Sequence, residues 1–600
     1  MTTYYVAPNG NDNNSGSINE PWETGNHRLA PGDTVYFRAG TYRRRLIPQS
    51  SGTSQEPITF ANYRNETAKL VGESGTERII DIRSCHNIVI DGFELEFDKG
   101  HSDPGTKKWA LVDVRNSVRN ITLRNLYIHK DTEPLSDYRK GYREMGIQVS
   151  ESDRVMIEGC QISGMNMGIA LRSKCTNTWI KRNRISNTVQ SCIVFGTSLG
   201  TMRGCLVERN LLEGSVIEDG IQFMQDYNAP DTSLDVSNRG TIIRNNVIRN
   251  NNENAVDLKG ARFICIEENV IYGTVGSSDG PLRGWNRNAL YGIARGNRTE
   301  CQDVIIRHNI MYDNPRAIKL HGENTKVYNN TIVFNNRDYT GSDSSLGTDG
   351  SFGFVGIFQQ FSNQINLGIR NNIIGGHKTG QVALRLGSTS IDIDYNLYFQ
   401  GPDGAPVNVD YRSPTNQATF RFGAWQSVLN ADTSVSGGDS HSQWISWDDV
   451  AFVNVPAKPT GAHTNYDFEL QQRSAAYESG GPLTHVRGSG SDNRVTVDDA
   501  SWFMDGYTSA LVEGDTITVD TQTAAIREIN TSTNTLILDR RIQFRNGAPV
   551  YFGATNRPHM GAQKNSGDVI VPPTPDPTPV RIPKLLWVGN PVGVRVGTSE

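Results

Sequence analysis

The amino-acid sequence predicts an all-β protein, a right-handed parallel β-helix with a small C-terminal β module, on three observations. A short β-branched run followed by Asn and another apolar pair recurs along the chain. Glycine is abundant at 59 residues and methionine scarce at 10, which fits strands and turns better than helices. Between residues 485 and 560, alternating strand-like segments separated by turn residues follow the repeats.

An asparagine recurs at the same place in each repeat. It stands at Asn125, Asn183, Asn210, Asn246, Asn269, Asn309, Asn330 and Asn372. The shortest spacing, from Asn309 to Asn330, is 21 residues, about what a coil of three short strands requires. We expect each Asn to take the left-handed conformation at a tight corner and to bond to its equivalent one coil away. Asn183, Asn210, Asn246, Asn269 and Asn309 should therefore align along one corner.

A second element is a column of outward side chains. In segments such as Gly220-Ile-Gln222 and Ala317-Ile-Lys319, the residue after the aliphatic one should point away from the core. This rule places Gln222, Asp257, Tyr291, Lys319 and Arg385 in one exposed column, with coils about 4.8 Å apart. Earlier coils carry Ala170 and Val194 there, so polar chemistry should concentrate in the middle of one face.

Composition shifts divide the chain. We expect an N-terminal cap over 1–50, parallel coils over 51–400, closing turns over 401–484, a small β module with a terminal coil over 485–571, and a Pro-rich linker with a C-terminal tail over 572–600.

Charge and hydropathy limit the classes of partner. The net charge of −5 is small for 600 residues, so the chain as a whole is not expected to bind nucleic acid. No run of about 18 apolar residues is present, so no membrane span is expected. The opening residues lack the pattern of a secretory signal, and we nevertheless expect a secreted or extracellular protein.

The seven cysteines are an odd number without CxxC pairs, which argues against a disulfide framework and a zinc site. We expect most of them to be small buried hydrophobic residues.

Several motifs are similar to those of known families. The segments 4–12 and 31–42 resemble the N-terminal cap of bacterial right-handed β-helix carbohydrate enzymes, and Asp467-Phe-Glu-Leu470 is similar to their terminal coil. Three others resemble polysaccharide lyase family 9, the pectate and rhamnogalacturonan lyases: Asp219-Gly-Ile-Gln222, the run 252–257 ending in Asp257, and Arg316-Ala-Ile-Lys319-Leu-His-Gly322.

The family resemblance implies a calcium-assisted lyase acting on a uronate polymer. It implies Ca²⁺ ligands at Asp219, Glu253, Asn254 and Asp257, although Glu253 and Asn254 stand where the family has two aspartates. Hard oxygen ligands of this kind suit calcium. It also implies that Lys319 is the base, and a nearby guanidinium would lower the pKa of its amine toward neutrality.

Other residues receive supporting roles in this hypothesis. Lys259 is a rival base on the same strand as Asp257, and Tyr291 is a proton donor or a stacking platform for a sugar. Arg316 and His321 assist binding or protonation. Gln222, Arg385 and Trp285 are expected to contact substrate, Trp285 from a segment that looks inserted.

Alternatives stay open at this point. Asp219, Glu253 and Asp257 offer the paired carboxylates of a glycoside hydrolase. A uronate epimerase, a lyase of another β-helix family or a non-catalytic sugar-binding β-helix would also use this face. In the leading hypothesis the partner is an acidic polysaccharide and the protein is a monomer.

Overall fold

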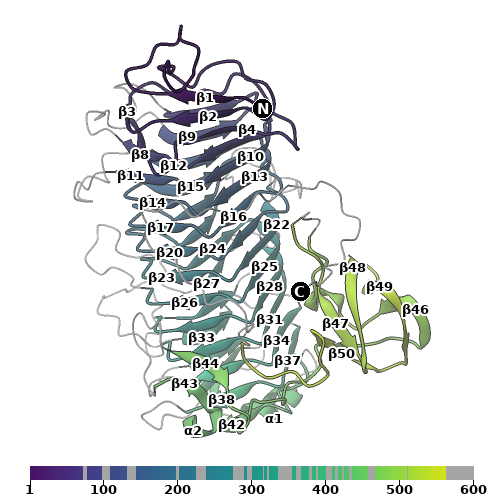
Figure 1. Cartoon of the computed structure of the whole chain (residues 1–600). Coiled ribbons are helices and arrows are strands. Elements are labelled where there is room, and N and C mark those ends of the chain that lie inside the picture. The colour runs from purple at the N-terminus through teal and green to yellow at the C-terminus, as the bar shows by residue number, and fades with distance from the viewer. Residues whose placement is uncertain are drawn as a thin grey trace.

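A computed structural model gives the architecture (Figure 1). It describes residues 1–71, 78–97, 109–130, 144–196, 202–224, 238–274, 290–293, 301–314, 316–320, 323–335, 354–359, 366–376, 382–386, 390–400, 408–412, 417–421, 424–431, 435–456, 466–507, 509 and 511–562. Within these ranges, none of the helices is both long and apolar enough to cross a membrane.

Three long parallel sheets, here called A, B and C, run along the stack of coils. Sheet A orders its strands as β1 (Thr3–Val6), β2 (Thr34–Phe37), β4 (Ile58–Asn62), β7 (Ile88–Asp91), β10 (Arg119–Arg124), β13 (Asp153–Glu158), β16 (Trp179–Lys181), β19 (Leu206–Glu208), β22 (Asn238–Arg244), β25 (Ala261–Glu267), β28 (Gln302–Arg307), β31 (Glu323–Tyr328), β34 (Leu367–Arg370), β37 (Ile391–Asp394) and β41 (Val435–Ser436). Sheet B has β3 (Gly40–Tyr42), β5 (Ala68–Val71), β8 (Glu94–Phe97), β11 (Tyr127–Lys130), β14 (Gln161–Ser163), β17 (Arg184–Ser186), β20 (Leu211–Glu213), β23 (Val247–Arg249), β26 (Val270–Tyr272), β29 (Ile310–Tyr312), β32 (Thr331–Val333), β35 (Ile373–Gly375), β38 (Leu397–Phe399) and β42 (Gln443–Ile445).

Sheet C carries the predicted column. It has β6 (Ile80–Arg83), β9 (Trp109–Arg115), β12 (Glu144–Val149), β15 (Met167–Leu171), β18 (Ile193–Phe195), β21 (Ile221–Phe223), β24 (Val256–Lys259), β27 (Leu290–Ile293), β30 (Ile318–Leu320), β33 (Phe354–Gln359), β36 (Val382–Leu386) and β39 (Asn408–Arg412), closed by the antiparallel β40 (Gln417–Arg421). One turn of the chain thus supplies one strand to each sheet, and inward aliphatic side chains form a continuous core between the sheets. This arrangement confirms the predicted parallel β-helix.

The remaining elements follow the coils. They are α1 (Ala424–Ala431), α2 (Trp447–Val450), the pair β43 (Phe452–Asn454) and β44 (Asp467–Leu470), a 3₁₀ turn at Ala500–Trp502, and the sheet of the C-terminal module, made of β45 (Thr484–His485), β46 (Gly490–Thr496), β47 (Thr516–Val519), β48 (Gln522–Asn530), β49 (Thr535–Phe544) and β50 (Pro549–Phe552).

Parallel pairing extends beyond the predicted limits of the coils, residues 51 and 400. At the start, β1 pairs with β2 and β2 with β4, so the predicted cap is already part of sheet A. At the end, β41 and β42 pair with β37 and β38, which adds a coil inside the segment expected to form closing turns. These strands are too short to stand out as periodic patterns in the sequence.

The asparagine ladder aligns along one corner, as predicted. Asn183 Nδ2 donates to Asn210 Oδ1 at 3.0 Å, and the same contact recurs from Asn210 to Asn246 at 2.9 Å. It continues through Asn269, Asn309, Asn330, Asn372 and Asn396. Each amide therefore satisfies buried polar groups of the neighbouring coil.

For seven of the eight predicted asparagines the conformational reason is wrong. Only Asn125 is left-handed, at φ 55°, and its amide bonds to Asp91 Oδ1 and not to a ladder Asn. The left-handed residue is the one before each ladder position, for example Arg182 at φ 54°, Arg209 at φ 55° and His308 at φ 53°. The ladder Asn itself lies outside the left-handed region, and it is favoured because its amide bonds upward and downward at once.

Asp439 ends the ladder inside the last coil. Its Oδ1 accepts from Asn396 Nδ2 at 3.3 Å and from the hydroxyl of Ser442, while its Oδ2 is buried without a hydrogen-bond partner. Burial raises the pKa of Asp439 to about 7. The folded protein therefore keeps a proton on this carboxyl that the unfolded chain loses above about pH 4.

Replacing Asp439 by Asn should stabilise the protein at neutral pH. The contribution of Asp439 to wild-type stability falls as pH rises from about 4 to 7, because the unfolded chain releases the proton first, and the amide removes this contribution. We expect a gain of roughly 1–4 kcal/mol at pH 7.5 and almost none at pH 4, measured by urea unfolding. The exposed Asp448→Asn serves as control. An equal gain at both pH values would contradict the assignment.

The C-terminal module packs on the outer face of sheet A, beside β25 to β37 in Figure 1. Outward apolar side chains of sheet A, among them Leu206, Ile242 and Tyr328, share one core with the module. Arg307 crosses this interface: its guanidinium contacts Asp515 twice at 2.7 Å and Glu267 at 2.7–2.8 Å. The side chain of Arg307 is 1% exposed.

All seven cysteines are buried thiols, as predicted. Burial raises the pKa of Cys160, Cys192 and Cys205 to about 12 and raises that of Cys175 as well, so these sulfurs stay protonated and unreactive.

Candidate functional site

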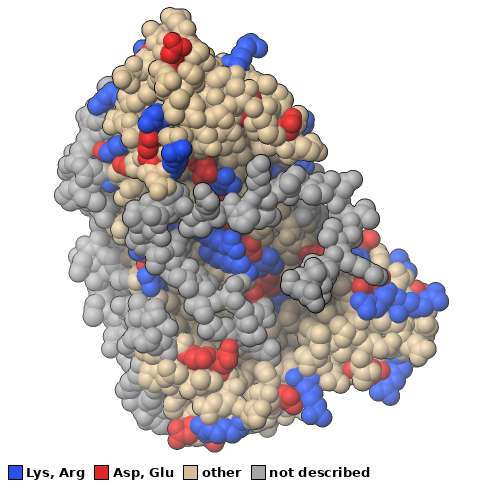
Figure 2. Space-filling view, viewed as in Figure 1, with Lys and Arg blue, Asp and Glu red and all other residues tan. Residues whose placement is uncertain are grey.

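The strand register places the predicted column along sheet C. Gln222 pairs with Asp257, Asp257 with Tyr291, and Tyr291 with Lys319. Figure 2 shows acidic and basic side chains close together in the middle of this face, where Figure 1 labels β24 and β27. Ala170 and Val194 occupy the column in earlier coils, as predicted.

One residue of the column, Phe358, was not predicted from the sequence. Phe358 lies between Lys319 and Arg385, since it pairs with both. Its segment Gly356-Ile357-Phe358 has the same form as Gly220-Ile221-Gln222, so the signal was present in the sequence.

For some predicted site residues the structure describes the side chain, for others only the strand, and two lie outside the described residues. Tyr291 and Arg385 are placed in their strands, and their side chains are not among the described ones. Trp285 and His321 lie outside the described residues. The prediction of an exposed column is wrong for Gln222, Asp257 and Lys319, which are all buried. The Oε1 of Gln222 has no hydrogen-bond partner.

Two adjacent turns bring acidic side chains together beside the column. The backbone N–H of Glu253 donates to the carbonyl of Glu218 at 3.0 Å, which sets the two turns side by side. Asp219 Oδ1 accepts from the backbone N–H and the side-chain amide of Asn254, at 3.0 and 2.8 Å. Asp219 is fully buried, and its Oδ2 has no hydrogen-bond partner.

The charges of this cluster perturb one another. Burial, followed by the repulsion of Glu253, Asp257 and Glu218, raises the pKa of Asp219 well above its usual range. Burial likewise raises the pKa of Glu218. Because like charges this close resist simultaneous ionisation, the cluster attracts a proton or a cation.

Lys259 supplies a positive charge inside the cluster. Its Nζ lies 2.5 Å from Asp257 Oδ2, and the residue is 8% exposed. Burial disfavours the ammonium form, but Asp257, Asp219 and Glu253 outweigh burial and raise the pKa of Lys259. An amine held protonated in this way is a poor base.

Lys319 differs from Lys259 in its protonation. It is 3% exposed, and burial together with the Arg316 guanidinium lowers its pKa to about 7. Asp257 and Glu253 act in the opposite direction and do not cancel this shift. A large fraction of Lys319 is therefore a neutral amine near pH 7.

Glu218 is a site residue that sequence reasoning missed. Its Oε2 lies 3.4 Å from the hydroxyl of Ser191, and it borders Gln222 and Lys259. No sequence pattern marks it, since it only precedes Asp219 in a turn, and burial is what makes its carboxyl unusual.

The donor chemistry of the cluster fits a hard cation, because Asp219 Oδ2 is buried and unsatisfied among carboxylates. The carboxylate oxygens of Asp219, Glu253 and Asp257 lie farther apart than the ligand atoms of a formed metal site. Within the described ranges, three acidic or histidine donors gather within 4.8 Å only at Glu94, Glu96 and His129, where Lys69 also pairs with Glu94 at 3.3 Å. Asp219, Glu253 and Asp257 would hold an ion only if their ligand oxygens came closer together than they are here, with Lys259 as an internal counter-charge.

Comparisons with known proteins bear on the fold. The family model described as "Right handed beta helix region" matches residues 80–228 and 112–280. "Uncharacterized protein YwoF" of Bacillus subtilis (strain 168) is 35% identical over 132 residues, which cover 21% of this chain and 28% of that protein. The alignment thus spans little more than a quarter of the curated relative.

Solved structures with this architecture are similar at low identity. The pectate lyase Pel9A is 15% identical with a TM-score of 0.38, covering 82% of this chain and 94% of that one. The GH136 lacto-N-biosidase from Eubacterium ramulus is 13% identical with a TM-score of 0.40, covering 69% and 67%. Neither likeness carries an argument about activity. Together with the sheet order, the family match shows that the chain folds as a right-handed parallel β-helix.

Proposed function

We propose that the protein is a polysaccharide lyase that cleaves a uronate-containing polymer by β-elimination, with Lys319 as the base. The observation that carries the proposal is the buried Lys319, whose pKa is lowered to about 7 beside a cluster of carboxylates. The order of the three motifs similar to polysaccharide lyase family 9 supports the same reaction.

In this reaction the neutral amine of Lys319 takes the proton from the carbon next to the uronate carboxyl group. The carbon–oxygen bond to the neighbouring sugar breaks, its electron pair leaves with the oxygen, and a carbon–carbon double bond forms. Arg316 lies near Lys319 and carries the charge to bind the uronate carboxylate. The leaving oxygen then takes a proton, which Tyr291 would supply from the coil between Asp257 and Lys319.

Calcium remains part of the proposal. When bound at Asp219, Glu253 and Asp257, it would draw charge from the substrate carboxylate and acidify the adjacent proton. Asp257 and Lys319 lie two strands apart in sheet C, about 10 Å, which leaves room for one sugar carboxylate and its α-carbon.

The direct test is a panel of uronate polymers, with galacturonan, rhamnogalacturonan, alginate and glycosaminoglycans, each with and without Ca²⁺. A lyase gives an unsaturated product that absorbs in the ultraviolet. New reducing ends without that absorbance would instead indicate hydrolysis, and a changed sugar configuration at constant chain length would indicate an epimerase. If none of the polymers is changed, the protein is a sugar-binding protein and not an enzyme on these substrates.

The rate should depend on the protonation of Lys319. Because the base must be neutral, kcat/KM should rise as pH increases through about 7 and level off above it. The profile is measured between pH 5 and 9.5 at constant ionic strength. A rate that is already maximal at pH 5 would contradict a lysine base.

Calcium binding can be tested without turnover. Calorimetry of the chelator-treated protein should show Ca²⁺ binding, and Asp219→Asn should weaken it because the buried Oδ2 loses its charge. The matched control is Asp448→Asn, an exposed carboxylate remote from the column. Absence of binding, with activity unchanged by chelator, would remove calcium from the mechanism.

The raised pKa of Asp219 favours one second candidate, a glycoside hydrolase with Asp219 as the acid. Its geometry is less suitable, since Asp219 is fully buried and Asn254 occupies its Oδ1. Asp219→Asn would abolish a hydrolase whether or not Ca²⁺ is present.

A further inference from the structure

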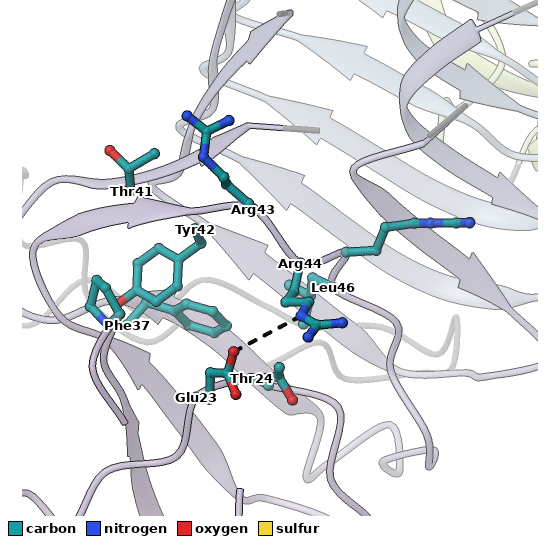
Figure 3. A pocket seen from close by; sticks show the side chains of 11 residues that line it. Glu23, Thr24, Phe37, Thr41, Tyr42, Arg43, Arg44 and Leu46 are labelled. Carbon is teal, nitrogen blue, oxygen red and sulfur yellow. Dashed lines mark ion pairs between the residues drawn. The ribbon is translucent and has the colours of Figure 1, made fainter. Parts of the chain in front are cut away.

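A cavity lies at the N-terminal end of the coils (Figure 3). It has a volume of about 230 Å³, and the buried side chains of Phe37, Tyr42 and Leu46 form part of its wall. Nine strand spacings of sheet B separate β3, which contains Tyr42, from β29, the neighbour of Lys319 in the chain. At ~4.8 Å per strand this is about 40 Å.

The rim of the cavity is basic. Three consecutive residues, Arg43, Arg44 and Arg45, line it together with one acid, Glu23. The Arg44 guanidinium faces Glu23 across the cavity, whereas the Arg43 side chain points away from it (Figure 3). Arg44 Nε is 3.9 Å from Glu23 Oε1, and their side chains are 66% and 47% exposed. An exposed pair at this distance is weak, and the guanidinium can readily exchange it for a ligand anion.

The arginine run is held in place before any ligand arrives. Asn26 clamps it, since its Nδ2 donates to the carbonyl of Arg45 at 2.9 Å and its Oδ1 accepts from Ile47 N–H at 2.7 Å. Leu46 pairs with Ile80 as a bridge to sheet C. A fixed backbone reduces the entropy that binding must overcome.

Apolar ring faces with a basic rim suit a sugar that carries a carboxylate. The wall can pack against the apolar face of a pyranose, while guanidinium groups bind its carboxylate with two parallel hydrogen bonds. The volume is smaller than the few hundred Å³ typical of drug-sized ligands, so it suits one or two sugar units.

We infer that this cavity is an accessory site for one or two uronate units of an anionic polysaccharide. The identity of the polymer as the substrate rests on the proposed function; the binding of a carboxylated sugar does not. A polymer held at both places would have a higher effective concentration at the column.

The test places a reporter in the cavity. Thr41 lines the pocket and is exposed, and all seven native cysteines are buried, so Thr41→Cys can be labelled selectively with a trifluoromethyl group. The label is followed by ¹⁹F NMR in the Lys319→Ala background, which prevents turnover. The probes are a galacturonate trisaccharide and its carboxyl-reduced form. Ser532→Cys, an exposed position in the module, carries the control label.

The carboxylated trisaccharide should shift the Thr41 label, with a Kd roughly ten-fold or more below that of the reduced sugar. Arg43→Ala with Arg44→Ala should weaken binding by a similar factor, whereas the exposed Arg487→Ala should not. A silent Thr41 label, equal affinity for both sugars, or full binding by the double variant would each overturn the inference. Wild-type turnover is measured separately, so an inactive protein that still shifts the label refutes only the proposed function.

Discussion

Replacing Lys319 by Ala should reduce kcat by about 10²- to 10⁴-fold, the contribution of a positioned general base. The folded structure should tolerate the change, because burial already disfavours the ammonium form of Lys319 and its loss removes that penalty. The measurements are the initial rate of ultraviolet absorbance and the thermal midpoint of the same preparation. The drop should appear in kcat with little change in substrate binding.

A matched pair of substitutions separates Lys319 from Lys259. Lys319→Arg should be as inactive as the alanine variant, since a guanidinium does not release its proton at the working pH. Lys259→Arg should keep most of the activity, because Lys259 serves as a positive charge beside Asp257. If the two variants rank in the opposite order, Lys259 is the base; if both are active, elimination by lysine is wrong.

Replacing Arg307 by Met should lower the free energy of unfolding by about 3–5 kcal/mol, the usual loss when one member of a buried ion pair is removed. Asp515 and Glu267 would then stay buried at the interface without the guanidinium that bonds to both. Urea unfolding followed by tryptophan fluorescence measures the change, because Trp502 packs in this interface. We expect the module to detach before the coils unfold.

Two comparisons check this assignment. Adding Glu267→Gln and Asp515→Asn to Arg307→Met should recover much of the lost stability, since no unpaired charge remains. Arg545→Ala, which removes an exposed pair with Asp520 at 3.3 Å, should have little effect. A small effect of Arg307→Met would show that apolar contacts alone hold the module.

The repeat could be predicted from the sequence because each coil needs the same strands, the same corner and the same buried hydrogen bonds. Every ladder Asn has the same neighbours, so its pattern recurs, and the alternation of each strand fixes which residues reach the column. The left-handed residue was misassigned because the position before the ladder Asn holds Arg182, Arg209 and Glu268 as well as types that favour that conformation, such as Asn245 and His308, so no single residue type marks it. At Arg182 and Arg209 the geometry of the coil overrides the backbone preference of the residue type.

The site was only partly readable, since pKa depends on burial by distant segments. Lys259 and Lys319 lie two strands apart in sheet C, on β24 and β30, and the sequence ranks them by motif alone. Their different environments, an adjacent Asp257 in one case and Arg316 in the other, set their protonation. Consecutive apolar residues such as Leu206-Val207 and Ile242-Ile243 are buried because sheet A is covered on both faces, and this cover was not predicted from the sequence.

The asparagine ladder fixes the axial distance between neighbouring coils, whatever the length of chain between them. Ladder partners are 40 residues apart from Asn269 to Asn309, 21 from Asn309 to Asn330 and 42 from Asn330 to Asn372, yet each step makes the same contact. Extra residues therefore leave the axial rise unaltered, and separations along the axis come in whole coils. Deleting the single coil that contains Tyr291 would move Lys319 about 4.8 Å closer to Asp257, with no intermediate setting available.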